Sequence, residues 1–439
     1  MASSINAPQD PEGPPSVTPA AYKPRYIDIG INLADPIFRG VYNGKQRHDD
    51  DLAGVVGRAR QVGCTKLIVT GSSFKSSRDA LTLAEEYPGT IYTTAGIHPC
   101  SSSIFDATHQ TSHQDDEGEG DETQHTPPCD PDPDAPIPDS QTTDPARTES
   151  IISDLRALIT SGWSSSALVA FGEFGLDYDR LHYCSRSLQL HSFSSQLVLA
   201  ANLTPQLPLF LHSRAAHSDF VSCLRTAFGP RLERLVRGGV VHSFTGTAAE
   251  MVELMDLGLY IGLNGCSFKT AENCEVVRAV RLDRLMLETD GPWCEVRPSH
   301  EGWKYLVEVE KAEREAEEAA KAEMEAARPR SAMETESLPT AENGVAENGN
   351  GSVEKPRPRK KPQQQPSKKS QKKEPEVPER FKTVKKDKWV EGAMVKGRNE
   401  PCTIERVAKI VAAIKGVPVQ EVCEAAWSNT VKVFGLDES

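Results

Sequence analysis

Five ionisable residues each stand at the end of a short apolar run in the sequence. They are His98, Glu173, His212, His242 and Asp290. Imidazole nitrogens and carboxylate oxygens are the ligands that divalent metals take in many hydrolases, with one coordination position left for water. Singly, each residue has a structural alternative, because a lone histidine is often hydrogen-bonded packing and an aspartate often caps a turn. Their joint recurrence at the ends of separate runs predicts a metal site.

The apolar runs that precede these residues are expected to be strands. Eight runs alternate with helical patterns, and most are continuously apolar, which is typical of parallel strands buried on both faces. The predicted strands are 25–32, 66–71, 91–98, 167–175, 207–214, 238–244, 259–265 and 285–290. Eight βα units in order predict an α/β fold, a closed (β/α)8 TIM barrel, in which the loops after the strands form the active face.

Amphipathic patterns between and after these runs predict helices. The predicted helices include 49–63, 74–87, 148–161, 185–203 and 246–258, with two more at 403–415 and 419–434. Several of them end at a glycine just before the next strand, which is the usual helix stop.

Two segments break this alternation, and we expect both to be disordered insertions in a barrel of residues 23–439 that follows a disordered lead-in, 1–22. Residues 101–147 are acidic, rich in Pro, Asp, Ser and Thr, and without periodicity. Residues 310–380 are a charged low-complexity insert. Residues 307–354 carry 13 acidic and 5 basic residues, whereas 355–380 carry 10 basic and 3 acidic ones. The stretch EKAEREAEEAAKAEMEAA has the composition of a solvated helix.

The formal net charge of −13 argues at first against a nucleic-acid partner. Residues 101–150, however, carry 13 acidic residues and one arginine, so this stretch alone accounts for −12. The rest of the chain is close to neutral and has no broad basic surface for tight duplex binding. A nuclease of this kind would hold phosphate locally, through metal and a few basic side chains.

Composition also bears on the compartment. Ten cysteines without a CxxC pair are typical of reduced thiols in an intracellular protein. No apolar run approaches about 18 residues, so no membrane span is expected, and the lead-in lacks the apolar core of a signal peptide. The basic tract 355–373 is typical either of a nuclear address or nucleic-acid tether, or of a solvated linker. We expect an intracellular protein, in the cytoplasm, the nucleus or both.

A series of motifs resembles, in order, those of TatD-type deoxyribonucleases, and the opening segment resembles the eukaryotic subgroup most. The motifs are YIDIGINL, DPIFRGVYNGKQRHDDDL, TAGIHP, GEFGLDYDRL, LPLFLHSR, GGVVHSFTGT, LYIGLNGCS, LMLETDGPWC and GRNEPC. They cover nearly the whole chain except the lead-in and the two inserts. That family resembles the amidohydrolase superfamily in fold and hydrolyses phosphodiester bonds with divalent metal. The resemblance therefore implies a metal-dependent deoxyribonuclease with DNA as substrate.

The resemblance also implies roles for the residues of the metal site. Glu173 in GEFGLD matches the central metal carboxylate, which can bridge two ions. His212 and His242 match metal-binding imidazoles. Asp290 matches a metal ligand that can also take a proton from the attacking water. We expect one or two divalent ions per chain, Mg²⁺ from the family, with Zn²⁺ or Mn²⁺ as alternatives because mixed donors select weakly between them.

Three further residues match positions near the substrate, and two positions depart from the family pattern. His98 in GIHP is expected to touch substrate phosphate, and Arg214 and Arg398 are candidates for phosphate binding or for structural ion pairs. Many relatives carry an Asp-x-His-x-His-type motif whose two histidines bind the first metal. Gly30 and Asn32 stand at those two positions here, which puts the number of ions in question.

The reaction expected from these residues is hydrolysis of DNA phosphodiester bonds by metal-activated water, with Asp290 and Glu173 as the catalytic pair. Two alternatives stay open. The same scaffold could act on another ester or amide, because fold and metal do not fix the leaving group. Alternatively, the barrel could be a non-catalytic nucleic-acid- or protein-binding module whose charged inserts recruit partners.

Overall fold

The computed structural model describes residues 22–108, 141–326 and 377–437. The chain divides into two units, Met1–Tyr305 with Phe381–Ser439, and Leu306–Arg380. Most of helix α8 (Trp303–Ala326) belongs to the second unit. Its residues from 311 to 326 are all exposed, so the solvated helix predicted for this stretch is confirmed.

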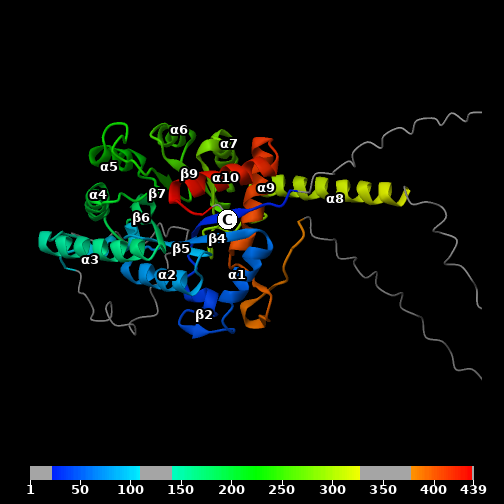
Figure 1. Ribbon diagram of the computed structural model, residues 1–439, viewed down its shortest axis with the longest axis horizontal. Coiled ribbons are helices and arrows are strands. Elements are labelled where there is room, and N and C mark those ends of the chain that lie inside the picture. Colours follow the sequence, from blue (N-terminus) through cyan, green and yellow to red (C-terminus); the bar gives the residue numbers. More distant parts are fainter. Residues whose placement is uncertain (1–21, 109–140, 327–376, 438–439) are drawn as a thin grey trace, which may run out of the picture. The chain divides into compact units, whose positions relative to one another are not determined.

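The first unit is built on eight parallel strands, and the predicted (β/α)8 barrel is confirmed (Figure 1). The strands are β1 (Tyr26–Ile31), β4 (Cys64–Val69), β5 (Ile91–Ala95), β6 (Leu168–Asp177), β7 (Leu209–Arg214), β8 (Gly239–Val241), β9 (Tyr260–Leu263) and β10 (Leu285–Leu287). They follow one another in the sheet in this same order, and each pairs in parallel with the next. Every predicted strand is present, with ends within three residues of prediction.

Helices surround these strands, as Figure 1 shows. They are α1 (Leu52–Gln61), α2 (Phe74–Glu86), α3 (Pro145–Ser164), α4 (Arg186–Asn202), α5 (His217–Phe228), α6 (Ala248–Asp256), α7 (Ala271–Ala279), α9 (Ile404–Lys415) and α10 (Val419–Phe434). The predicted helices lie within three residues of these bounds; α5 and α7 complete the βα alternation. Two short strand pairs lie outside the barrel, β2 (Val41–Tyr42) with β3 (Lys45–Gln46) and β11 (Thr383–Val384) with β12 (Met394–Val395). Among the described residues, no helix is both long and apolar enough to cross a bilayer.

The barrel is closed between β1 and β10, at the two ends of the strand order. No ladder joins these two strands among the pairings of the described sheet. Instead, the backbone N–H of Asp290 donates to the carbonyl of Gly30 at 2.8 Å, and the N–H of Asn32 donates to the carbonyl of Gly291 at 2.8 Å. These two bonds join the chain just past β10 to β1, so the seam of the barrel lies directly under the predicted site.

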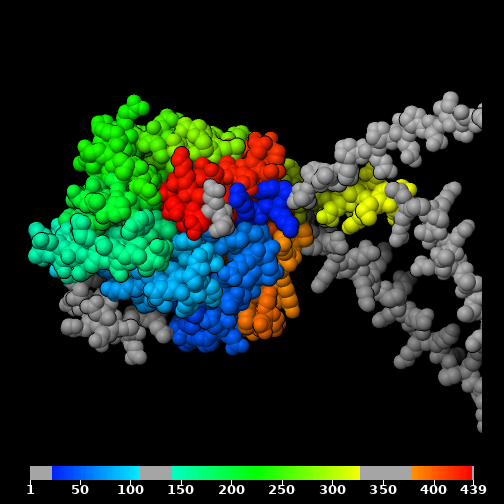
Figure 2. Space-filling view, viewed as in Figure 1, coloured from blue at the N-terminus to red at the C-terminus, as the bar shows by residue number. Residues whose placement is uncertain are grey.

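The two termini of the described barrel pack together on the side away from the site. Trp427 and Phe434 of α10 belong to the same buried cluster as Ile27 of β1 and Val169 of β6. Figure 2 shows the N-terminal segment beside the C-terminal helices on the surface. This packing fills the barrel with apolar side chains near the strand starts, and leaves the strand ends for polar groups.

The predicted inserts are described only at their edges. Ser102 and Phe105 are buried in a 3₁₀ helix, η2 (Pro99–Phe105), and Asp106 pairs with Thr143 just before α3. Ordered residues therefore lie at both ends of the segment 101–147, because these apolar and capping contacts tie them to the barrel. The lead-in up to residue 21, residues 109–140 and residues 327–376, which include the basic tract, lie outside the described residues.

Candidate metal centre

The polar residues predicted at strand ends gather in one pocket at the mouth of the barrel. The pocket is lined by Asn32, Ser72, His98, Ser101, Glu173, Arg180, His212, Arg214, His242, Ser243, Asp290 and Trp293. All five residues of the predicted ionisable cluster are in this set, as is Arg214. The loops after parallel strands converge at one end of a closed barrel, so this grouping follows from the topology.

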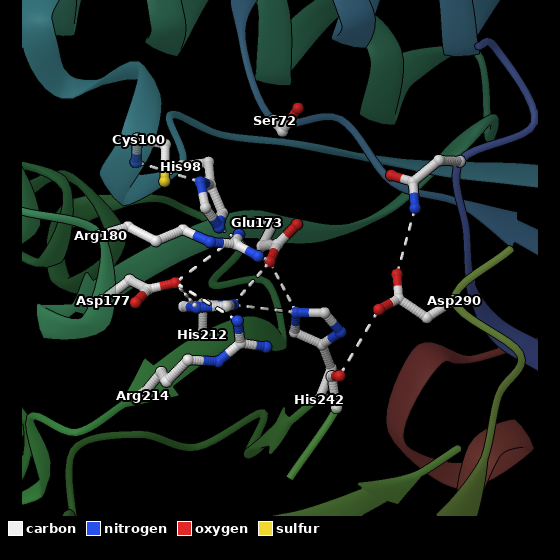
Figure 3. A network of polar contacts seen from close by, with 12 residues as sticks. Ser72, His98, Cys100, Glu173, Asp177, Arg180, His212, Arg214, His242 and Asp290 are labelled. Carbon is white, nitrogen blue, oxygen red and sulfur yellow. Dashed lines mark hydrogen bonds and ion pairs between the residues drawn. The ribbon is translucent and has the colours of Figure 1, made fainter. Parts of the chain in front are cut away.

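Glu173 lies at the centre of the pocket, with three imidazoles around one of its oxygens (Figure 3). Its Oε1 is 2.6 Å from His242 Nε2, 3.0 Å from His212 Nδ1 and 3.4 Å from His98 Nε2. Burial alone would raise the pKa of Glu173. The positive charge of His242 and the hydrogen bonds from His212 and His242 hold it well below its usual range instead. Glu173 is therefore a buried carboxylate that stays negative.

The glycines on either side of Glu173 allow β6 to approach β7 closely. Gly172 and Gly175 have φ of 150° and 157°. A Cβ at either position would collide with a backbone carbonyl of β7, that of Phe210 or of His212. Only glycine tolerates both the conformation and the approach. The FGEFG motif therefore sets Glu173 next to the histidine of the neighbouring strand.

His212 is held between two carboxylates. Its Nδ1 faces Glu173, while its Nε2 is 3.1 Å from Oδ2 of Asp177, which is fully buried. Arg180 and Arg214 lie 3.8 and 3.9 Å from the same oxygen. Burial would raise the pKa of Asp177, but the hydrogen bond with His212 and the nearby positive charges keep it well below its usual range. A negative Asp177 accepts a hydrogen bond from Nε2–H, so the Nδ1 lone pair would be directed at the pocket once a cation replaces the proton that Nδ1 shares with Glu173.

His242 also lies between two carboxylates, although the second one is beyond hydrogen-bond distance. Its Nε2 faces Glu173, and its Nδ1 is 3.6 Å from Oε2 of Glu288. Glu288 is fully buried, and its Oε1 accepts hydrogen bonds from the Ser243 N–H and from Asn264 Nδ2. Burial would lower the pKa of His242, but the negative Glu173 and Glu288 raise it well above its usual value. The same two carboxylates that stabilise a proton on this imidazole would also stabilise a metal cation bound to it.

His98 is oriented differently, by the backbone of η2. Its Nδ1 accepts a hydrogen bond from the N–H of Cys100 at 3.1 Å. Burial lowers the pKa of His98 to about 3, so the ring is neutral and its proton is on Nε2. His98 therefore presents an N–H donor to the pocket, rather than a lone pair.

Asp290 lies across the pocket from Asp177, as Figure 3 shows. Its Oδ1 accepts from Asn32 Nδ2 at 3.1 Å, and its Oδ2 lies 3.5 Å from Ser243 Oγ and 3.2 Å from the sulfur of Cys294. Its φ of 52° is in the left-handed region, which Asp tolerates better than most residues. The turn that follows β10 thus directs this carboxylate into the pocket.

Gly30 and Asn32 stand at the two positions that depart from the family motif, and neither leaves an empty space. A Cβ at Gly30 would lie 2.5 Å from Oε2 of Glu288 and 3.3 Å from the ring of Phe210. The space of a side chain at position 30 is thus taken by Glu288. Asn32 is present in the pocket, where its amide binds Asp290 rather than offering an imidazole. A carboxylate and an amide therefore stand where many relatives are expected to have two histidines.

The structure does not bring Arg398 to this pocket. Arg398 is 2% exposed and forms buried ion pairs with Asp51 and Glu400, which also pair with Arg58. Its guanidinium lies over the ring of Phe38. Arg398 was a candidate for phosphate binding or for a structural ion pair. Its buried position favours the structural ion pair, because its charge is already neutralised beneath the surface.

The donor set of the pocket fits a divalent metal. One side-chain nitrogen or oxygen of each of His98, Glu173 and His212 lies within 4.8 Å of the others, the one such group of residue types that bind metals among the described residues. His242 shares the same oxygen of Glu173, and Asp290 faces the pocket from the opposite wall. Buried imidazoles and carboxylates with a second carboxylate behind two of the histidines are typical of metal centres.

Sequence reasoning missed two residues of this centre, Asp177 and Glu288. Side chains at i, i+2 and i+4 of a strand share a face, so alternation along β6 could have identified Asp177, four residues after Glu173. Glu288 follows β10, Arg180 is in the 3₁₀ helix η3 (Tyr178–Arg180) and Ser243 follows β8, so no strand period applies to them.

Comparison with known proteins supports the same conclusion as the geometry. Residues 27–331 match the model of the family described as TatD related DNase. A protein of Schizosaccharomyces pombe named Deoxyribonuclease Tat-D is 35% identical, over 93% of this chain and 96% of that protein. A Pantoea protein named 3'-5' ssDNA/RNA exonuclease TatD is 35% identical, over 62% of this chain and 82% of its own length. A crystal structure of an uncharacterized amidohydrolase from Saccharomyces cerevisiae superposes with a TM-score of 0.61 and 29% identity, covering 93% of this chain and 99% of the other.

Proposed function

The chain belongs to the TatD related DNase family, and from this premise we propose that it hydrolyses phosphodiester bonds of DNA with the help of a divalent metal ion. Membership of the family confirms the predicted enzyme class, a hydrolase of the deoxyribonuclease type. The observation that carries the proposal is the meeting of three imidazoles on one buried oxygen of Glu173. A structural histidine needs a single partner, whereas here two imidazoles share one carboxylate oxygen as a set that a cation completes, and the third ring adds a hydrogen-bond donor beside them.

We assign metal binding to Glu173, His212, His242 and Asp290. A divalent ion bound there would acidify water and neutralise negative charge on the phosphate. Mg²⁺ is the ion proposed from the family, and Zn²⁺ and Mn²⁺ suit the same mixture of nitrogen and oxygen donors. One ion fits the group around Glu173; Gly30 and Asn32 offer no imidazole for a second.

Asp177 and Glu288 are proposed as positioning residues for the two metal-binding histidines. Each carboxylate lies against the ring nitrogen that faces away from Glu173. Such a carboxylate fixes the tautomer of the ring and keeps the other nitrogen available to the metal. Both are fully buried, which limits the freedom of the rings they hold.

His98 is proposed to bind the substrate phosphate rather than the metal. Its Nδ1 is occupied by the Cys100 N–H, so Nε2 carries the proton and can donate it to a phosphate oxygen. Arg214 lines the same pocket, 14% exposed at its side chain, and supplies positive charge at the mouth. Together they provide one hydrogen-bond donor and one cation for a phosphodiester.

Asp290 is proposed as the group that takes the proton of the attacking water. Its two oxygens are held by Asn32, Ser243 and Cys294, so the carboxylate has a fixed direction. A positioned carboxylate within reach of water acts as a general base.

We propose single-stranded DNA as the preferred form of the substrate, because the near-neutral barrel lacks a broad basic surface for binding a duplex and the Pantoea relative is named for single-strand activity.

The experiment is a nuclease assay on the purified full-length chain with single-stranded DNA, duplex DNA and RNA, with and without chelator. We expect metal-dependent cleavage that Glu173→Gln and Asp290→Asn reduce by at least about 100-fold, the scale of losing one electrostatic catalytic group. Glu253→Gln is the matched control, because Glu253 also pairs with a histidine, His217 at 2.9 Å, but outside the pocket. Full activity in chelator, or in both pocket variants, would refute the proposal.

The second candidate, a hydrolase of another ester or amide, is tested with the same protein preparations. The superposition on a structure titled an amidohydrolase is the observation that favours including it. Turnover of simple esters or amides that exceeds turnover of DNA, and that depends on Glu173 in the same way, would select this candidate. Binding of DNA without cleavage of any of these substrates would instead select a non-catalytic barrel.

A further inference from the structure

Two cysteine thiols lie against each other beside Asp290. Cys266 is in η4 (Gly265–Phe268), the turn that follows β9, and Cys294 is in the loop that follows β10. Their sulfur atoms are 2.8 Å apart. The sulfur of Cys294 is also 3.2 Å from Oδ2 of Asp290. The pair thus forms a chain of contacts that ends on a carboxylate of the candidate site.

The two loops that carry these thiols are already in contact through their backbones. A Cβ at Gly265 would collide with the carbonyl oxygen of Cys294. The two backbones are therefore so close that no side chain fits between them at this point. A disulfide has a sulfur–sulfur bond of about 2.05 Å. The two sulfurs would therefore need to approach by less than about 1 Å, which side-chain rotation can supply.

The pair differs from the other buried thiols of the barrel. Cys266 and Cys294 are 3% and 8% exposed. Cys274, at 1% exposed on α7, is a buried thiol whose sulfur faces no second sulfur among the described residues. Proximity of two thiols, rather than burial or exposure of one, is what singles out this site.

We propose that Cys266 and Cys294 are a redox modification site, which a peroxide converts to an intrachain disulfide. One sulfur attacks a peroxide oxygen, and the O–O bond breaks to give a sulfenic acid and, with hydrogen peroxide, one water. The second sulfur then displaces the hydroxyl from the sulfenic sulfur, and a second water leaves with the remaining proton. The two sulfurs together lose two electrons, and the peroxide gains them.

Oxidation at this pair lowers the activity of the neighbouring site, a consequence that rests on the proposed function. The disulfide removes the thiol hydrogen from Cys294, so Asp290 loses a hydrogen-bond donor. It also ties the loop after β10 to η4 by a covalent bond. A displacement of about 1 Å at a reacting group can cost on the order of 100-fold in rate, so we expect activity to fall at least tenfold and to return with a dithiol reductant.

The first test maps the disulfide and is independent of nuclease activity. The full-length protein is treated with hydrogen peroxide or diamide, alkylated after denaturation and digested. We expect a loss of two of the ten thiols and a peptide pair joined through Cys266 and Cys294. If neither oxidant joins these two residues in the folded protein, or if other cysteines are joined instead, the proposal is overturned.

The second test measures nuclease activity before and after oxidation in variants. Cys266→Ala removes one sulfur without touching Asp290. Before oxidation, its nuclease activity should therefore match that of the wild type, and peroxide should no longer lower that activity. Cys274→Ala is the matched control and should remain as sensitive as wild type. Cys266→Ser serves as a second variant if the alanine variant has a lowered melting temperature. A mapped disulfide that leaves nuclease activity unchanged overturns the coupling to the site. A mapped disulfide in a protein that shows no nuclease activity even in its reduced form refutes the proposed function and leaves the modification site standing.

Discussion

The pairing of Asp177 with His212 makes a quantitative prediction about metal affinity. Asp177→Asn keeps the size of the side chain but replaces the negative oxygen at 3.1 Å from Nε2 by an amide. The amide can donate to Nε2, and the ring proton then moves to Nδ1, where it faces Glu173. The lone pair that His212 directs at the pocket would be lost in that tautomer.

The magnitude follows from the role of such partners in metal centres. Removal of a carboxylate that orients a metal-binding histidine typically weakens metal affinity by about 10- to 100-fold, or about 1.4–2.7 kcal/mol. The effect on Asp177 should lie in the upper half of this range, because the residue is fully buried and also faces Arg180 and Arg214. Those charges would lose their compensating carboxylate in the same variant.

The assay is a titration of the metal-free full-length protein with Mn²⁺ or Zn²⁺, followed by calorimetry or by competition with a chelating dye. Asp219→Asn is the matched control, because Asp219 is also an ion-paired aspartate, with Arg186, but lies outside the pocket. Circular dichroism and the melting temperature verify that both variants are folded. If folded Asp177→Asn binds metal as tightly as wild type, the reasoning about the tautomer of His212 is refuted.

Four further predictions follow from other residues. Burial raises the pKa of Asp28 to about 8, above the value of about 3.9 in an unfolded chain, so the native state keeps a proton that the unfolded state releases. The free energy of unfolding should therefore fall as pH rises from about 4 to about 8, by about 1.4 kcal/mol per unit, and urea unfolding of Asp28→Asn should show a flatter profile. Gly30→His should not add a metal ligand, because Glu288 fills the space; we expect a loss of about 1–3 kcal/mol in stability from overpacking and no tighter metal binding by calorimetry. Arg398→Met should cost about 3–5 kcal/mol, because it removes one of the two buried cations that neutralise Asp51 and Glu400 and leaves Arg58 to balance both carboxylates, while the metal affinity of the folded fraction stays at the wild-type value. Metal at 100 times its dissociation constant should stabilise the protein by about 2.7 kcal/mol, so a melting temperature that is unchanged by chelator would contradict a metal centre.

The fold was predictable from sequence because its signals are local and repeated. Runs such as those of β4 and β7 are continuously apolar, and the helices between them are amphipathic, so period and order together define the barrel. The strand ends were less predictable. The predicted strand 238–244 includes His242 and Ser243, but β8 ends at Val241, and Ser243 has a φ of 48°, which is outside the strand region.

The site was predicted in its central residues but not in its supporting ones. Glu173, His212 and His242 are exceptional in their local sequence, since each is an ionisable group after an apolar run. Asp177 lies beyond the predicted strand 167–175, and its role depends on a contact with His212 of the next strand. Arg398 stands within a motif that resembles the family, yet its function as a buried ion pair depends on residues more than 300 positions away. Pairings of this kind are set by three-dimensional packing, which a single sequence does not specify.

The position of the seam between β1 and β10 links the chemistry of the pocket to the mechanics of the barrel. At the first and last strands, closure depends on two backbone bonds and on the amide of Asn32 reaching Asp290. A ligand that engages Asp290 together with Glu173 ties the segment after β10 to β6, and it thereby restrains the Asp290 side of this junction. Hydrogen exchange of amides near the seam should then slow when the pocket is filled, because opening the barrel there would require Asp290 to leave the ligand.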